Sequence, residues 1–431
     1  MTRKMKDSGV EWIGEIPEDW VINPLSNRFK EHKVKNIGNT EKNVLSLSYG
    51  HIVKRNVDNN KGLLPESFET YNIVFPGNIV LRLTDLQNDQ KSWRVGLVKD
   101  KGIITSAYLT LEAECNDISN TFYYYLFHIY DRTKIIYNMG NGVRQNLKYS
   151  ELCKLPIVVP PIEQQNHIAS FLDTKCSLID AAVQKERGII GKLKEYRQAV
   201  ITEAVTKGIR AGVPMKDSGV EWIGEIPEGW DVIKLGFVAD VQTGPFGSQL
   251  HNEDYVEEGT PIITVEHFGD NIINHSNLPL VSDEDVIRLK KYILIDGDLV
   301  FSRVGSVDRC VLVSPEEQGW LFSGRCLRVR LGNNVNKKFI NYCFNKKAFR
   351  EYMNLIAVGS TMPSINTSIL SNVKIPMPSF EEQTSIVFHL DAKCSAIDAT
   401  IQKRELAIEK LTAYKQSLIY ECVTGKKEVL G

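Results

Sequence analysis

The apolar residues follow a coiled-coil spacing in two long stretches of the chain. Residues 162–213 contain no proline, and alternating steps of four and three visit ten positions from Leu172 to Ala204, eight of them apolar or cysteine. The same walk from Leu390 to Cys422 again gives eight such positions. The sequence therefore predicts two long helices, each with an apolar seam.

Two seams in one chain are expected to bury each other. The polar breaks fall at equivalent places, Glu186 and Arg197 in one helix and Arg404 and Lys415 in the other. Antiparallel pairing would relate the halves by a pseudo-twofold axis and bring Glu186 to Arg404 as an ion pair. The positions that we expect to pair are Leu172, Ile179, Val183, Glu186, Ile190, Leu193, Leu390, Ile397, Ile401, Arg404, Ile408 and Leu411.

The length of these helices suggests a measuring role. About 40 helical residues at ~1.5 Å each span about 60 Å, which approaches two turns of B-DNA at ~34 Å per turn. A helical hairpin that only holds two halves together is the alternative, and both roles are compatible.

Two blocks of sequence occur twice. MKDSGVEWIGEIPEDW (residues 5–20) returns as MKDSGVEWIGEIPEGW (residues 215–230), with fifteen of sixteen positions identical at an offset of 210. LDTKCSLIDAAVQKE from Leu172 returns as LDAKCSAIDATIQKR from Leu390 at an offset of 218. The segments between the blocks differ in length and in sequence. The chain therefore reads as a repeated frame that carries two different variable domains.

Each variable domain is expected to be mixed α/β. In the first, the expected strands are 43–50, 72–84 and 94–98, and the expected helix is 121–130. In the second, the expected strands are 261–268, 292–304 and 320–331, and the expected helix is 337–353. The likeness of PGNIVLRL to DGDLVFSR suggests that one fold has diverged twice. The fold class is thus α+β, divided into 1–159, 160–213, 214–377 and 378–431.

Composition changes this picture little. The net charge of −1 argues weakly against nucleic-acid binding, but residues 21–150 carry +5, residues 231–300 carry −9 and residues 303–350 carry +7. Such polarity can give a basic face for phosphates, or an ordinary solvated surface. No run of eighteen apolar residues, no signal peptide and no CxxC pair occurs. We expect a cytoplasmic protein with free thiols and no membrane segment.

Polar loops supply the candidate DNA contacts. Gly, Ser, Thr, Asn, Gln and Arg donate to phosphates or reach base edges, although each such loop can equally be a plain surface turn. Trp93 can equally cap the edge of a core. The candidates are Ser48, Tyr49, Lys54, Arg55, Thr84, Gln87, Asn88, Lys91, Trp93, Arg94, Arg144, Gln145, Asn146, Thr243, Phe246, Ser248, Gln249, Arg303, Ser306, Arg309, Ser360, Thr361, Ser364 and Asn366.

Catalytic signatures are missing from the sequence. There is no Asn/Asp-Pro-Pro-Tyr/Phe tetrad for adenine methylation, no glycine-rich cofactor loop after a strand and no GxxxxGK[ST] loop for ATP. Asp173 with Lys175, and Asp391 with Lys393, weakly resemble nuclease pairs but lie in the predicted helices. We expect no catalytic residue, no metal and no cofactor.

The block KDSGVEWIGEIPExW, the PPIEQQ and PSFEEQ turns into long helices, the pattern LDxKCSxID and GPFGSQL together resemble the specificity subunit of type I restriction–modification enzymes. The resemblance covers essentially the whole chain. It implies that each variable domain is a target-recognition domain reading one half of a split, asymmetric site on double-stranded DNA. It also implies that the helices set the gap and dock two modification (methyltransferase) subunits, which a restriction (translocase–nuclease) subunit joins.

Two other functions stay open at this point. The chain could serve a modification-only or type IIB-like complex, which the sequence does not separate from a full type I system. It could also be a coiled-coil scaffold that binds no DNA, against which the basic stretches, polar loops and unequal domains count.

Overall fold

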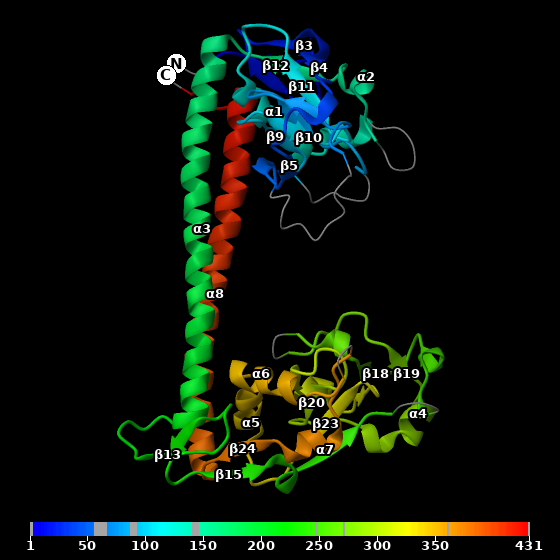
Figure 1. Cartoon of the computed structure of the whole chain (residues 1–431), viewed down its shortest axis with the longest axis vertical. Helices are drawn as coiled ribbons and strands as arrows, with labels where there is room; N and C mark the ends of the chain where they lie inside the picture. The colour runs from blue at the N-terminus through cyan, green and yellow to red at the C-terminus, as the bar shows by residue number, and fades with distance from the viewer. Residues whose placement is uncertain are drawn as a thin grey trace. The chain divides into compact units, whose positions relative to one another are not determined.

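The computed structural model describes residues 3–55, 67–86, 93–139, 146–245, 249–269, 272–359 and 362–429. The chain divides into two compact units (Figure 1). Unit 1 comprises Met1–Arg187 and Glu405–Gly431, and unit 2 comprises Gly188–Arg404. Each unit thus holds one variable domain and a part of each long helix.

Unit 1 is built on a four-stranded antiparallel sheet in the order β4-β11-β8-β9. The central strand β8 is buried along its whole length, as an unbroken apolar run predicts. Helix α1 (Asn120–Arg132) packs Phe122, Leu126 and Ile129 into the same core. The strands are β1 (Met5–Asp7), β2 (Glu15–Pro17), β3 (Val21–Pro24), β4 (Phe29–Glu31), β5 (Leu45–Ser48), β6 (His51–Lys54), β7 (Asn72–Val74), β8 (Ile79–Leu81), β9 (Val95–Leu97), β10 (Gly102–Ile104), β11 (Leu109–Ala113) and β12 (Pro156–Val159), and a short helix α2 spans Tyr149–Leu152.

Unit 2 repeats this sheet in the order β16-β23-β20-β21. Ile79 of β8 pairs with Leu97 and Leu111, and Leu299 of β20 pairs with Leu312 and Val329. The register confirms that PGNIVLRL and DGDLVFSR are equivalent segments of one fold. The strands are β13 (Met215–Asp217), β14 (Glu225–Pro227), β15 (Asp231–Lys234), β16 (Ala239–Thr243), β17 (Tyr255–Val256), β18 (Thr260–Ile263), β19 (Leu280–Val281), β20 (Leu299–Ser302), β21 (Cys310–Leu312), β22 (Leu321–Phe322), β23 (Cys326–Leu331) and β24 (Lys374–Met377).

The two units differ in what surrounds the shared sheet. Unit 2 adds a second sheet in the order β17-β19-β18-β22, in which β18 and β22 are parallel. The described part of unit 1 has instead the hairpin β5–β6 and the pair β10–β7. The drift in sequence between the variable domains therefore corresponds to different additions on one scaffold.

Several predicted elements are wrong in extent, and one of them is the strand 72–84 of unit 1, which is divided into β7 and β8 by a turn with Gly77 at φ +93°. The expected helix 337–353 is split into α5 (Lys337–Phe344) and α6 (Lys347–Ile356), because Lys346 has an extended backbone at the start of α6. The expected strand 292–304 is extended only over β20, because a turn with Gly297 at φ +84° precedes it. Two further helices, α4 (Asp283–Arg288) and α7 (Thr367–Asn372), complete unit 2.

The repeated blocks form the same joints in both units. β3 pairs with β12 and β15 pairs with β24, so the opening block of each unit is closed by the strand that precedes its long helix. Gln165 donates to the Pro160 carbonyl and accepts from the Ser119 amide. Gln383 makes the same two bonds, to Pro378 and from Asn336, so the PPIEQQ and PSFEEQ turns enter their helices alike.

The long helices are α3 (Ile162–Lys207) and α8 (Phe380–Val423). They run antiparallel within unit 1, where Asp180 contacts Lys415, and within unit 2, where Arg197 contacts Asp398. No position of either predicted seam is exposed; the positions toward the helix ends, such as Leu172 and Leu390, are buried, and those between, such as Val183 and Ile408, are half-buried. Supercoiling, the pseudo-twofold axis and the pairing of Glu186 with Arg404 stay predictions.

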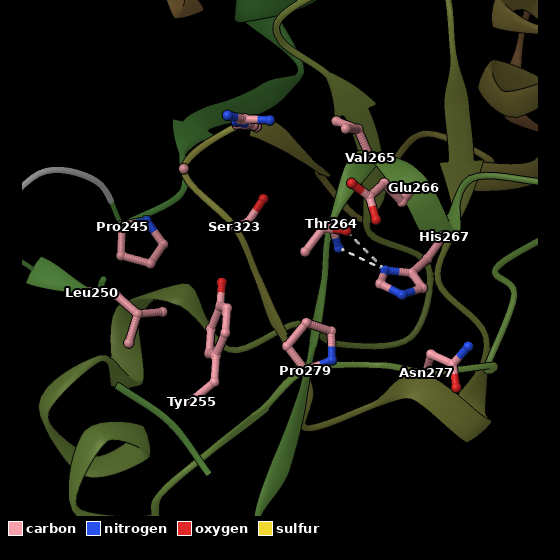
Figure 2. Close-up of a pocket in the computed structure, with 12 residues that line it drawn as sticks. Pro245, Leu250, Tyr255, Thr264, Val265, Glu266, His267, Asn277, Pro279 and Ser323 are labelled. Carbon is pink, nitrogen blue, oxygen red and sulfur yellow. Dashed lines mark hydrogen bonds between the residues drawn. The ribbon is translucent and has the colours of Figure 1, made fainter. Parts of the chain in front are cut away.

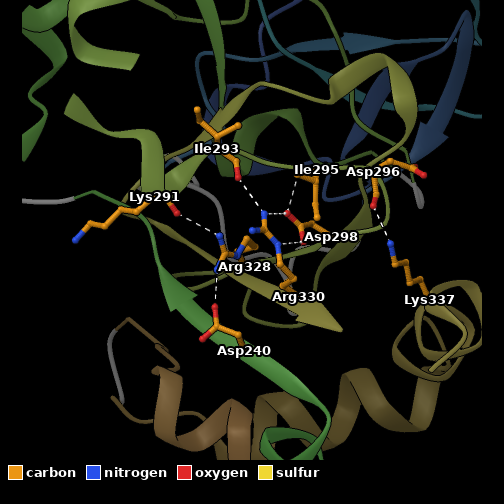
Figure 3. Close-up of polar contacts among 9 residues, drawn as sticks. All are labelled: Asp240, Lys291, Ile293, Ile295, Asp296, Asp298, Arg328, Arg330 and Lys337. Atoms are coloured by element: carbon orange, nitrogen blue, oxygen red, sulfur yellow. Dashed lines mark hydrogen bonds and ion pairs between the residues drawn. The ribbon is translucent and has the colours of Figure 1, made fainter. Parts of the chain in front are cut away.

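A polar network on β23 binds the acidic and basic stretches of unit 2 together (Figure 3). Arg330 contacts the buried Asp298 through two nitrogens, at 2.8 and 2.6 Å, and Arg328 contacts Asp240 at 2.5 Å. Both arginines also donate to carbonyls, those of Ile293 and Lys291. Part of the positive charge of residues 303–350 is therefore neutralised by carboxylates of the same domain and does not contribute to a basic face.

All eight cysteines are free, as expected. Over the residues that are described, no helix combines the length and the apolar character needed to cross a membrane.

Candidate nucleic-acid interface

In unit 2, three loops meet at one end of the shared sheet. The backbone of Arg303 donates to the Arg325 carbonyl at 2.8 Å and accepts from the Ile365 amide at 2.9 Å. Its guanidinium also donates to the Gly324 carbonyl at 3.3 Å. We call this group the unit 2 loop cluster, which comprises residues 303–309, 323–325 and 362–366.

The predicted DNA-contacting residues of unit 2 differ in how accessible they are to a ligand. Ser306, Arg309 and Asn366 are exposed on the unit 2 loop cluster, although the Asn366 side chain caps α7 by accepting from the Ile369 amide. Thr243 and Ser364 are half-buried at the edge of the same group, Thr243 as the last residue of β16. Gln249 lies apart and accepts from the Tyr292 hydroxyl at 2.7 Å.

In unit 1, the loops at the equivalent end of the sheet are held together by the buried side chain of Arg94. This side chain is 0% exposed, and its guanidinium donates to the carbonyls of Arg82, Thr84 and Asp85 at 2.7–3.1 Å. The Asp85 amide in turn donates to the Asn146 side chain at 2.8 Å. We call residues 82–86, 93–94 and 146–147 the unit 1 loop cluster.

Burial changes the role of one candidate in that cluster. The guanidinium of Arg94 is committed to three carbonyls, so a direct contact with DNA does not fit its position, and we assign it the role of shaping the loop. Thr84 is half-buried and Asn146 is exposed, so both remain candidates for contact.

The two loop clusters are equivalent in register. The Arg82 amide donates to the Arg94 carbonyl at 2.8 Å, as the Ser302 amide donates to the Arg309 carbonyl at 3.0 Å. One scaffold therefore carries an arginine at the same place in both units. That arginine is turned inward in unit 1 and is exposed in unit 2.

The β5–β6 hairpin lies beside the unit 1 loop cluster. Tyr49 at its tip is 83% exposed, whereas a side chain at the neighbouring Gly50 would meet the Trp93 ring at 2.9 Å. Trp93 also packs edge-on against His128 at 5.0 Å and lies under the Arg132 guanidinium. Trp93 thus caps the edge of the core, and Tyr49 is the accessible aromatic group.

The remaining candidates of unit 1 at the hairpin fall into two groups. Ser48 is half-buried at the tip, while Lys54 is exposed and Arg55 half-buried at the opposite end.

Nine predicted contacts lie outside the described residues, namely Gln87, Asn88, Lys91, Arg144, Gln145, Phe246, Ser248, Ser360 and Thr361.

The structure adds residues that the sequence did not single out. A cavity of about 590 Å³ adjoins the unit 2 loop cluster through the turn at Ser323–Arg325 (Figure 2). Tyr255, Glu266, His267 and Asn277 also line it. These residues were missed because PIITVEHF was read as a strand, whereas the strand ends at Ile263 and a short 3-10 turn presents Glu266 and His267.

The carboxylates that weakly resembled nuclease residues have structural partners. Asp173 accepts from the Tyr125 hydroxyl at 2.8 Å, and Asp391 accepts from the Tyr342 hydroxyl at 2.7 Å. Both therefore tie a long helix to its variable domain.

One group in the described part of the chain has metal-ligand composition: His275, Glu316 and Glu317. Burial alone would raise the pKa of Glu317, but hydrogen bonds from Ser314 and His275 lower it below its usual range. Because Glu317 already caps the turn at Ser314, this group reads as a structural contact.

Comparison with known proteins places these features in a family. A model of the type I restriction modification DNA specificity domain matches residues 35–190 and 227–410. The MjaVIII specificity subunit of a type I restriction enzyme of Methanocaldococcus jannaschii is 24% identical over 96% of this chain and 94% of its own length. The EcoKI specificity subunit of Escherichia coli K12 is 22% identical over 96% and 90%.

Solved structures share the fold. A chain of a type I R-M system, solved to describe complex assembly and conformational transition, matches with a TM-score of 0.70 at 16% identity, over 96% of this chain and 99% of that one. The HsdS subunit of Thermoanaerobacter tengcongensis matches with a TM-score of 0.51 at 14% identity, over 96% and 98%.

Proposed function

Since the chain belongs to the family of type I restriction modification DNA specificity domains, we propose that it is the subunit that gives a restriction–modification complex its DNA sequence specificity. The observation that carries this proposal is one scaffold present twice with unlike loops. Equivalent backbone bonds hold both loop clusters, while the side chains they present differ, as Arg94 and Arg309 do. Two different readers in one chain suit an asymmetric, bipartite target on double-stranded DNA.

The exposed candidates supply the contacts in this proposal. Ser306, Arg309 and Asn366 serve unit 2, and Tyr49, Lys54 and Asn146 serve unit 1. Arginine and lysine contact phosphates or guanine, and amides contact adenine. The chain itself is non-catalytic in this proposal, and methylation and cleavage belong to partner subunits in the cytoplasm.

Two copies of the modification subunit fit the repeated helices. Tyr196 in unit 2 and Tyr414 in unit 1 occupy equivalent positions, because 196 plus 218 is 414. They are 54% and 55% exposed, so the same aromatic group is presented once per unit. Two equivalent surfaces suit two copies of one partner, and a restriction subunit completes the complex.

The boundaries follow the repeat. Residues 1–159 and 214–377 are the two target-recognition domains, and residues 160–213 and 378–431 are the helical spacers that set the gap between half-sites. Removing seven residues from within Ala181–Val200, with a matched removal from α8, is expected to change the gap and leave both half-sites intact.

A binding measurement tests the proposal against a scaffold that binds no DNA. The chain is combined with its modification subunits and titrated with duplex DNA at 50 and 200 mM salt in a gel shift. Phosphate contacts predict an affinity that falls steeply, by about a thousandfold or more for six or more contacts. Absent or salt-insensitive binding would favour the scaffold and overturn the proposal.

A further inference from the structure

The cavity of unit 2 has one apolar wall and one polar wall. Leu250, Tyr255 and Pro279 lie on one side, and Thr264, Glu266 and His267 lie on the other (Figure 2). Its volume of about 590 Å³ falls within the range of sites that hold small organic groups. Such a lining suits a flat heterocycle, whose faces are apolar and whose edge carries donors and acceptors.

One donor on the polar wall is fixed by the backbone. The Thr264 amide donates to Nδ1 of His267 at 3.2 Å, so Nδ1 is an acceptor and the ring proton of the neutral imidazole is on Nε2. The Thr264 hydroxyl lies 3.0 Å from the same nitrogen and holds the ring further. His267 is therefore a donor of defined direction on a buried side chain.

The neighbouring residues complete a base-reading set. Glu266 is exposed, and no hydrogen bond or ion pair engages it within the described part of the chain. A carboxylate accepts from the amino group of cytosine or adenine, and an N–H donor suits O6 or N7 of guanine. The carboxylate repels phosphate at the polar wall, whereas the exposed Arg325, which also lines the cavity, can contact the DNA backbone beside it.

The position of the cavity connects it to the DNA-contacting loops. Its turn at Ser323–Arg325 also belongs to the unit 2 loop cluster, where Arg303 holds both the Arg325 and Gly324 carbonyls. Its other walls come from Tyr255 of β17, from the turn that follows β18, and from the segments at Leu250 and Pro279 that flank the second sheet of unit 2. The described part of unit 1 has no such sheet, so this site distinguishes the two readers.

We infer that this cavity reads a nucleobase edge of the target DNA and determines part of the half-site of unit 2. The inference rests on the proposed function and names the residues, Glu266 and His267 first, that set one of its two specificities.

Sequencing of N6-methyladenine in a host that carries the chain with its modification subunits tests it. Glu266→Ala and Glu266→Gln are expected to relax or change one base pair in one half of the motif, by roughly tenfold to a hundredfold in discrimination. The other half is expected to stay as it is. Glu258→Gln is the matched control, because Glu258 is exposed in the turn between β17 and β18 and does not line the cavity.

The outcomes separate this inference from the proposed function. If the wild-type complex yields a split motif and both Glu266 variants leave it unchanged, the inference is overturned while the function stands. A wild-type complex without any split motif overturns both. His267→Gln supplies a second variant. Because this change removes the hydrogen-bond partner of Thr264, a thermal melt of the variant serves as the control that it is still folded.

A fluorescence arm identifies which form of the base is read. 2-Aminopurine placed at the affected position stays quenched when its base remains stacked and brightens when its base is drawn into the cavity. Either result, combined with the motif change, supports the inference.

Discussion

Lys415 donates to both carboxylate oxygens of Asp180, each at 2.7 Å, and so joins α8 to α3 within unit 1. In unit 2 the equivalent positions are Arg197 and Asp398, in contact at 3.0 Å. The repeat thus places the cation on α8 in one unit and on α3 in the other. The seam breaks at residues 197 and 415 are ion-pair positions, which explains why polar residues recur there.

Charge reversal tests this joint. Asp180→Lys is expected to lower the stability of unit 1 by about 1 kcal/mol, because Asp180 is 52% exposed and solvent screens the pair. Lys415→Asp in the same chain restores the attraction and should recover most of that loss in denaturant unfolding. Equal losses that simply add in the double variant would contradict a direct pair.

The two equivalent arginines are expected to behave oppositely. Arg94→Met leaves three carbonyls without their donor and should cost about 2–4 kcal/mol, with loss of the unit 1 half-site. Arg309→Met removes an exposed side chain and should change stability by less than about 0.5 kcal/mol while weakening DNA binding. Thermal melts and gel shifts on both variants check this, and a stable Arg94→Met chain would refute the buried role.

The turn before β20 offers a graded test in unit 2. Asp298 accepts from the Ile295 amide at 2.9 Å, as Asn78 accepts from the Phe75 amide at 2.8 Å in unit 1. Asp298→Asn therefore keeps the turn but loses the charge opposite Arg330, which should lower the stability of unit 2 by about 1–3 kcal/mol. Asp298→Ala loses both and should be less stable still, whereas equal melts for the two variants would speak against a separate ion-pair contribution.

His128 should make unit 1 acid-sensitive. Burial, and then the charges of Lys415 and Arg132, lower its pKa from 6.5 to about 3, so the fold holds the neutral ring. The unfolded chain takes up the proton near pH 6.5, so this stability is complete above that pH and is lost as pH falls toward 3. Between pH 6.5 and 5 the loss is about 2 kcal/mol.

His128→Phe keeps an aromatic ring beside Trp93 and removes the titration. Denaturant unfolding followed by tryptophan fluorescence at a series of pH values should show stability falling less steeply toward acid pH for this variant than for the wild type. Parallel pH profiles for the two chains would mean that His128 does not carry the acid effect.

The frame was predictable from sequence because its signals are local and occur twice. The heptad spacing from Leu172, the repeated blocks at Met5 and Met215 and the likeness of PGNIVLRL to DGDLVFSR can all be recognised in the sequence alone. The side chains that each loop cluster presents to solvent were not predictable in this way. Arg94 is turned inward to the carbonyls of residues 82–85, whereas Arg309 is exposed, and this difference depends on how each loop folds, which spacing does not encode.

The cavity of unit 2 escaped prediction for a related reason. Its lining comes from segments that are far apart in the chain, Tyr255, Glu266, Asn277 and Arg325, and no one of them carries a motif. The charge polarity of the same domain was also misleading, because Asp240 and Asp298 neutralise Arg328 and Arg330 internally.

The most direct test of two different readers in one chain is an exchange of residues 21–159 for the corresponding domain of another member of the family. Sequencing of N6-methyladenine in a host with the matching modification subunits gives the result. The account predicts a split motif in which one half changes and the other half and the gap are retained. A contiguous or palindromic motif, or a change in both halves, would contradict it.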